Sequence, residues 1–212
     1  TAKFRAYDTE PPVGEREGIQ RSTVEIPTMA EKLFVSEYER YRLMGNADEA
    51  VTAVYNDTLT LMRSIAARLE VAKGRALQDG SLTFTENGLD GIVMDFGRDA
   101  GHTVSTGTSW ATHATADPLG DLLSWQETYT DTNGVSPGGM ITSSTVLGHM
   151  LQNDALRGQM FSLGGATVPS RIDVARLTEY LLSYGLPPIE INDSKVSVDG
   201  VTTRIIDVDS VV

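Results

Sequence analysis

The residues best suited to catalysis stand close together in one loop, where Ser109, His113 and Asp117 could form a nucleophilic triad. Residues 107–111 imitate the Gly-x-Ser-x-Gly elbow of serine hydrolases, in which the serine sits between a strand and a helix. Here the flanking residues are rich in threonine and serine, and the histidine of that mechanism normally comes from much later in a chain. We therefore keep a small serine hydrolase using Ser109 only as an alternative, and we predict no catalytic residue.

The sequence offers little for binding a metal ion or a cofactor. The three histidines, His102, His113 and His149, lack the close spacing of metal ligands, and the chain has no cysteine. Residues 131–134 imitate the middle of a calcium loop, but Met140 occupies the position of the closing glutamate, so we predict a turn there. No glycine-rich nucleotide motif is present. We predict no metal, no cofactor and no enzymatic activity.

Composition limits the partners of this chain. Its 212 residues carry 29 acidic and 17 basic side chains, a formal net charge of −12. Because an acidic surface repels phosphate, tight binding of nucleic acid by charge is not expected. No apolar run is long enough to cross a bilayer, so no membrane partner is predicted.

The chain before residue 46 is predicted to be extended and to need a neighbour. Residues 10–18 are rich in proline, glycine and charges, as loops are. Residues 22–26 alternate like a short strand, and residues 31–43 could form a short helix. Such a segment cannot bury enough apolar surface to be a domain by itself.

The strongest helix prediction covers residues 46–78. Asp48 and Glu49 suit the positive end of the helix dipole, and Asp79 with Gly80 ends the pattern. At 1.5 Å per residue this helix is about 50 Å long, which makes it a spine rather than a small core helix. Its apolar residues recur at the 3.6-residue spacing, and we interpret the stripe they form as core or interface packing. They are Val51, Val54, Tyr55, Leu61, Met62, Ile65, Leu69, Ala72 and Ala76.

The rest of the chain mixes short strands and helices. Two alternating runs, 81–85 and 91–98, predict a β-hairpin around Asn87-Gly88. Trp110 and Trp125 are interpreted as loop or core anchors rather than ligand-stacking residues. Further helices are predicted over 117–130, over 145–153 and after a cap at Ser170, and further strands over 139–142, 189–191, 195–198 and 201–206. The pattern is that of an α+β protein.

Several of these pieces occur together in one known family. They are residues 77–80 at the end of the long helix, 82–85, 93–98, Trp110, 117–122 opening a helix, and 140–142. In this order and spacing, residues 75–161 resemble the phage-lambda-type major head protein, the capsid protein E family of the Hong Kong 97 capsid fold.

The resemblance implies an α+β fold in three units. Residues 1–45 would form the E-loop and its connection. Residues 46–116 would form the peripheral domain, with the spine helix over 46–78, a β-hairpin over 82–98 and a loop over 99–116. Residues 117–212 would form the axial domain. Family members are longer, so we expect the chain to be a fragment, without an N-terminal arm and without the final peripheral strands.

The resemblance also implies a function. We expect a major capsid subunit that self-assembles, as hexamers and pentamers, into the icosahedral head of a tailed phage or prophage-derived particle. Scaffold, decoration and portal proteins would be partners, and the shell would enclose DNA without reading its sequence. The protein would lie in the virion capsid, and in the host bacterial cytoplasm during assembly. An encapsulin-like compartment shell remains an alternative.

The E-loop of this fold reaches onto a neighbouring subunit. We therefore expect a subunit interface at the apolar residues of the N-terminal segment. These are Phe4, Tyr7, Ile19, Val24 and Ile26.

Overall fold

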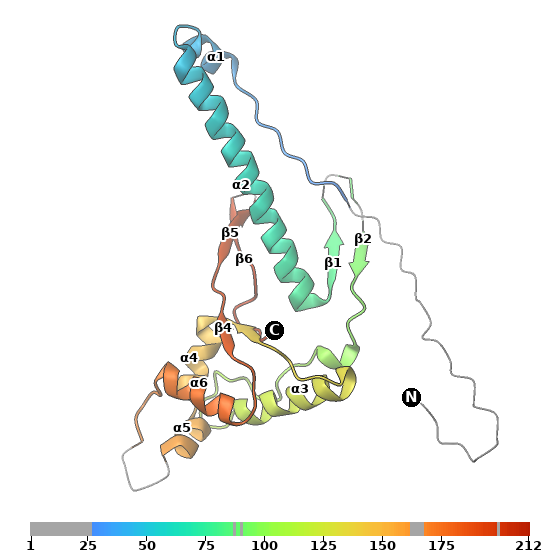
Figure 1. Ribbon diagram of the computed structural model, residues 1–212, viewed down its shortest axis with the longest axis vertical. Helices are drawn as coiled ribbons and strands as arrows, with labels where there is room; N and C mark the ends of the chain where they lie inside the picture. Colours follow the sequence, from blue (N-terminus) through green and yellow to red (C-terminus); the bar gives the residue numbers. More distant parts are fainter. Residues whose placement is uncertain (1–26, 87, 90, 162–167, 199) are drawn as a thin grey trace, which may run out of the picture.

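The computed structural model describes residues 27–86, 88–89, 91–161, 168–198 and 200–212. Figure 1 shows one long helix that projects from a cluster of shorter helices and small sheets. The elements, in chain order, are α1 (Glu37–Leu43), α2 (Ala47–Asp79), β1 (Ser81–Phe84), β2 (Ile92–Asp95), the 3-10 helix η1 (Ala100–His102), α3 (Pro118–Asn133), β3 (Met140–Thr142), α4 (Ser144–Gln152), α5 (Asp154–Phe161), α6 (Val174–Ser183), β4 (Ile189–Ile191), β5 (Lys195–Val198) and β6 (Val201–Arg204). This mixture confirms the predicted α+β class.

Helix α2 forms where its sequence predicts it. It starts after the extended residue Asn46, and Asp48 with Glu49 occupies its first turn. It ends at Gly80, which takes the left-handed conformation with φ 69° and donates its N–H to the carbonyl of Ala76. Among the described side chains of α2, the buried one is that of Val71, in the C-terminal third of the helix. The structure describes no helix that is both long and apolar enough to span a membrane.

The β1–β2 hairpin fixes the C-terminal end of α2. The strands pair antiparallel from Ser81 with Asp95 to Phe84 with Ile92. Beyond β2, the guanidinium of Arg98 donates hydrogen bonds to the carbonyls of Leu77 and Gln78, at 2.7 Å for Gln78. The free carbonyls at the end of a helix thereby obtain charged donors.

Helices α3 to α6 enclose one apolar core. We call the unit around this core the body: the described residues of 99–194 together with 207–212. Strands β3 and β4 pair in parallel within it, although 46 residues separate them in sequence. On the other side of β3 the C-terminal end pairs antiparallel, with Ile141 and Val212 exchanging backbone hydrogen bonds of 2.6 and 2.8 Å. The core is built from Trp110, Ala116, Leu119, Leu122, Met140, Val146, Leu147, Met150, Leu151, Leu156, Ile172, Leu177, Leu181 and Leu186.

The β5–β6 hairpin (residues 195–206) joins the body to α2, and we call it the bridging hairpin. A Cβ added to Gly74 would lie 2.2 Å from the carbonyl oxygen of Ile205, so only glycine permits this approach. One turn further along, Gln78 donates from Nε2 to the Asp207 carboxylate at 2.6 Å. It also accepts the Asp207 N–H at 2.9 Å. These contacts set the angle at which α2 leaves the body.

Two local predictions need correction, one helix was missed, and one predicted strand falls outside the described residues. The helix predicted over 31–43 begins only at Glu37, because the side chain of Ser36 caps it there. The last helix begins at Val174, with Asp173 rather than Ser170 at the N-cap position, and α5 was not predicted at all. The strand predicted over 22–26 lies outside the described residues.

Candidate assembly surface

The five predicted interface residues all lie outside the described part of the chain. They are Phe4, Tyr7, Ile19, Val24 and Ile26. Their role therefore stays a prediction. The described surface that could serve assembly begins at residue 27.

Residues 27–36 form an extended strap that precedes α1, and Figure 1 shows it running along α2. Glu31 accepts a hydrogen bond from the Ser64 hydroxyl on α2, which ties the strap to the helix. At its end, Ser36 and Glu39 form a capping box. The backbone N–H of Ser36 donates to Glu39 at 2.9 Å, and this bond, with the one from the Ser36 hydroxyl, lowers the pKa of the Glu39 carboxyl.

The strap, α1 and the residue that follows α1 expose large apolar side chains. Phe34, Tyr38, Tyr41 and Met44 are each at least 75% exposed. Grouped exposed apolar residues indicate an interaction surface, because each keeps ordered water that a partner would release. The interface residues that the sequence analysis named individually lie between positions 4 and 26. The aromatic residues of this short helix, none of which is buried, were the available signal.

The structure does not bring the candidate hydrolase residues together. His113 Nε2 lies 3.1 Å from His149 Nδ1. Asp117 instead caps α3 by accepting the Gly120 N–H at 3.1 Å. Among the described residues, no hydrogen bond joins Ser109 to His113 or His113 to Asp117, so the loop lacks the contacts of a triad.

The two tryptophans anchor the loop before α3, as predicted. Trp110 is 6% exposed and stacks on Trp125 of α3, with ring centroids 5.7 Å apart. Its indole N–H donates to Asp121 at 2.7 Å. A buried aromatic ring with a satisfied N–H is a packing anchor rather than a vacant ligand platform.

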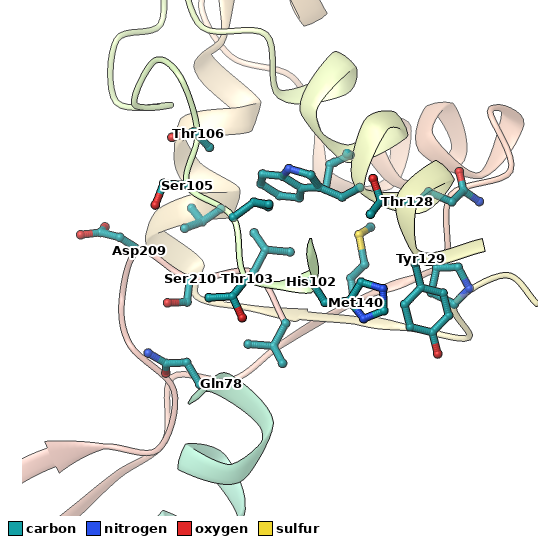
Figure 2. A pocket seen from close by; sticks show the side chains of 18 of the residues that line it. Gln78, His102, Thr103, Ser105, Thr106, Thr128, Tyr129, Met140, Asp209 and Ser210 are labelled. Atoms are coloured by element: carbon teal, nitrogen blue, oxygen red, sulfur yellow. The ribbon is translucent and has the colours of Figure 1, made fainter. Parts of the chain in front are cut away.

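A cavity of about 870 Å³ lies where α2 meets the body. Figure 2 shows His102 beside Tyr129 at one end of it, and Ser105 and Asp209 at the other. No group of three or more metal-ligating side chains occurs in the part of the chain that the structure describes. Hydroxyl groups and apolar side chains dominate the lining, so the cavity marks a joint between two packed units and shows no catalytic constellation.

Comparison with known proteins gives the chain a family. The family model described as phage major capsid protein E matches residues 1–212. None of the curated proteins matches the chain.

Two solved structures are similar to the chain. One is a proposed prophage capsid protein from E. coli CFT073, with 16% identity and a TM-score of 0.52, covering 87% of this chain and 54% of that one. The other is a phage-related protein from Bordetella bronchiseptica RB50, with 17% identity and a TM-score of 0.48, covering 72% and 43%. The chain thus spans about half the length of these two proteins. At 16% identity, the first likeness shows a shared fold and nothing more.

Proposed function

The chain belongs to the phage major capsid protein E family, and from this premise we propose that it builds the icosahedral head of a tailed phage or of a prophage-derived particle. Membership of this family gives the chain the role of a structural capsid subunit. The family match over residues 1–212 is the observation that carries the proposal. It gives no support to the alternatives, an encapsulin-like shell or a serine hydrolase.

The finer parts of the proposal concern the fold. We assign the chain to the Hong Kong 97 capsid fold, with residues 1–45 as E-loop and connection, 46–116 as peripheral domain and 117–212 as axial domain. The fold shared with a proposed prophage capsid protein supports this assignment. So does the sequence of a long helix, a hairpin and an α+β body.

The partners are proposed on the same basis. Copies of the chain would form hexamers and pentamers, with scaffold, decoration and portal proteins completing the particle in the host cytoplasm. Each contact can be weak, because closed symmetry repeats it many times. The net charge of −12 suits a wall that encloses DNA without gripping it.

Electron microscopy of the purified protein tests the proposal. We expect closed shells or ring-shaped capsomers, and nuclease-protected DNA in particles from infected or induced cells. A monodisperse monomer at all concentrations would contradict the proposal, and an enclosed enzyme in place of DNA would favour the encapsulin-like alternative. Ser109→Ala serves as a control, since we expect the assembled fraction to be unchanged. Esterase activity that this variant removes would favour the hydrolase.

A further inference from the structure

Two of the three histidines in the chain meet within the body. His113 lies in the loop of residues 103–116, between η1 and α3, and His149 lies in the last turn of α4. Nε2 of His113 is 3.1 Å from Nδ1 of His149, and the ring centroids are 5.4 Å apart. Both side chains are half-buried. We call this contact the histidine pair.

Other contacts hold the same loop against the junction of α4 and α5. Asn153 donates from Nδ2 to the carbonyls of His113 and Ala116, at 3.2 and 2.8 Å. The backbone N–H of Asp154 also donates to the His113 carbonyl, at 2.9 Å. None of these amide and carbonyl groups gains or loses a proton near neutral pH. Of these contacts, only the histidine pair can therefore respond to pH.

The hydrogen bond of the pair depends on the number of protons that the two rings carry. It needs one ring nitrogen as donor and the facing nitrogen as acceptor. Two neutral imidazoles meet this need, and so does a pair with one added proton, because the other ring still offers its lone pair. Two added protons place an N–H on both facing nitrogens and two positive charges side by side, so the bond is lost and the rings repel. Histidine changes its charge between about pH 5 and 8, so mild acid brings this change about.

The position of His149 decides which ring takes the first added proton. The last turn of a helix has free carbonyls, which favour a positive charge. Protonated His149 donates from Nδ1 to the neutral Nε2 of His113. The first added proton therefore preserves the contact, and only the second breaks it.

The ionisable groups around the pair do not compensate a second positive charge. They are Asp117, Asp121, Asp154 and Arg157 near the two segments, and Asp79, Arg98, His102, Tyr129 and Asp209 around the cavity that His149 also lines. The carboxylates of Asp117, Asp121 and Asp154 already accept hydrogen bonds from other groups. Among the described residues, no ion pair joins a carboxylate to either ring of the pair. The repulsion between two protonated rings is therefore not offset by a bound anion of the described chain.

We propose that the histidine pair is an acid-sensitive latch, which holds the loop of residues 103–116 on α4 and releases it when the pair takes up a second added proton. The inference does not rest on the proposed function, because both histidines belong to one chain. Release leaves the Asn153 contacts in place, so the loop loosens around His113 while the body stays folded.

The latch makes stability depend on pH in one direction. In the unfolded chain the two imidazoles bind protons independently, whereas the folded pair binds the second added proton poorly. Below about pH 6 the unfolded state therefore binds more protons, and the folding equilibrium constant falls as pH falls. One proton of difference corresponds to about tenfold per pH unit.

Equilibrium unfolding of the dissociated 212-residue chain between pH 5 and 7 tests the inference. Below about pH 6, the folding equilibrium constant of the parent should fall up to about tenfold per pH unit more steeply than that of His113→Gln or His149→Gln. Carboxylates are common to all three proteins, so their contribution cancels. His102→Gln keeps the pair and is the matched control: the excess slope should persist in that background. Equal slopes in the parent and both glutamine variants would overturn the inference.

Nuclear magnetic resonance of the imidazole nitrogens in the unsubstituted, dissociated chain gives a second test, which holds even where a glutamine variant fails to fold. The two rings of the pair should take up their added protons in two steps at least about one pH unit apart, and His102 in a single step. The fluorescence of Trp110, in the same loop, should change with the second step. Independent titration of His113 and His149 at one common pH would refute the latch, and so would tryptophan fluorescence that follows the first step.

Discussion

The body and the arm (residues 27–98) differ in how far they bury their apolar side chains. In the body, Leu177 and Leu181 of α6 are at most 1% exposed, packed with the other core residues. In the arm, Val71 is buried at 8% exposure, whereas Phe34 and Tyr41 remain nearly as exposed as in an unfolded chain. The body is therefore stabilised within one chain. The described residues of the arm have apolar surface left over, and this is the surface that we propose to meet neighbouring subunits.

The largest loss in the free energy of unfolding is expected for a substitution in the core of the body. Leu177→Ala should lower the free energy of unfolding by about 2–5 kcal/mol, because it leaves a cavity at a fully buried position. Leu182→Ala, on the 49% exposed side of the same helix, should cost about 0.5 kcal/mol or less. Urea denaturation followed by tryptophan fluorescence measures both. Equal costs at the two positions would contradict the packing described for α6.

The next largest loss of stability is expected where α2 of the arm packs against the bridging hairpin. Gly74→Ala should cost about 1–3 kcal/mol, because its Cβ would meet the backbone carbonyl of Ile205 at 2.2 Å. Gly148→Ala is the matched control inside α4, where an added Cβ meets nothing within 4 Å. That variant should gain up to about 1 kcal/mol from helix propensity. A stabilising Gly74→Ala would mean that α2 and the bridging hairpin do not touch.

A smaller effect is expected where Gln78 binds Asp207. Gln78→Ala removes two hydrogen bonds between α2 and the body and should cost about 1 kcal/mol. Hydrogen exchange at the Asp207 amide should become faster, since that N–H loses its acceptor. Gln152→Ala, whose amide binds only the Gly148 carbonyl within its own helix, should leave the Asp207 amide unchanged. Unchanged exchange of the Asp207 amide in both variants would show that the two hydrogen bonds between Gln78 and Asp207 are not formed.

The smallest loss of stability is expected at Asp193, and it disappears in acid. Hydrogen bonds from Ser144 and from Arg204 lower the pKa of Asp193, so its carboxylate favours the folded state. That contribution is present above the ordinary value of 3.8 and is lost as pH falls through the lowered pKa. Asp193→Asn should therefore be less stable than the parent at pH 7, and the difference should shrink as pH drops below about 4. Denaturation midpoints between pH 2 and 7 measure it, and a gap that stays constant to pH 2 would contradict this assignment.

The sequence predicted those elements whose signals are local. α2 carries its dipole charges, its glycine stop and a 3.6-residue stripe within its own segment. Helix α5 was missed because Asn153 serves two helices at once. It ends α4 with extended backbone, and its Oδ1 accepts the Leu156 N–H at 3.0 Å to start α5. The parallel pairing of β3 with β4 could not be predicted, because neither three-residue strand contains a sequence signal that specifies its pairing partner.

The candidate site was predictable in kind but not in place. Aromatic and aliphatic residues before residue 46 indicated a surface that needs a neighbour. The structure places the exposed ones it describes on the strap and α1. The loop around Ser109 had a hydrolase-like order of residue types, but only tertiary structure could pair His113 with His149 and assign Asp117 to the cap of α3. Spacing along a chain does not fix which side chains meet.

The sequence by itself determined that α2 exists, how long it is and which of its faces is apolar, because helix periodicity and end signals are properties of neighbouring residues. Only the tertiary structure decided which face the chain uses for itself. Apolar attraction has no direction, so it could not make that choice. Gly74 admits the backbone of Ile205, and Gln78 holds Asp207, so the chain packs against the smaller and more polar face. The apolar face is thereby left exposed among the described residues.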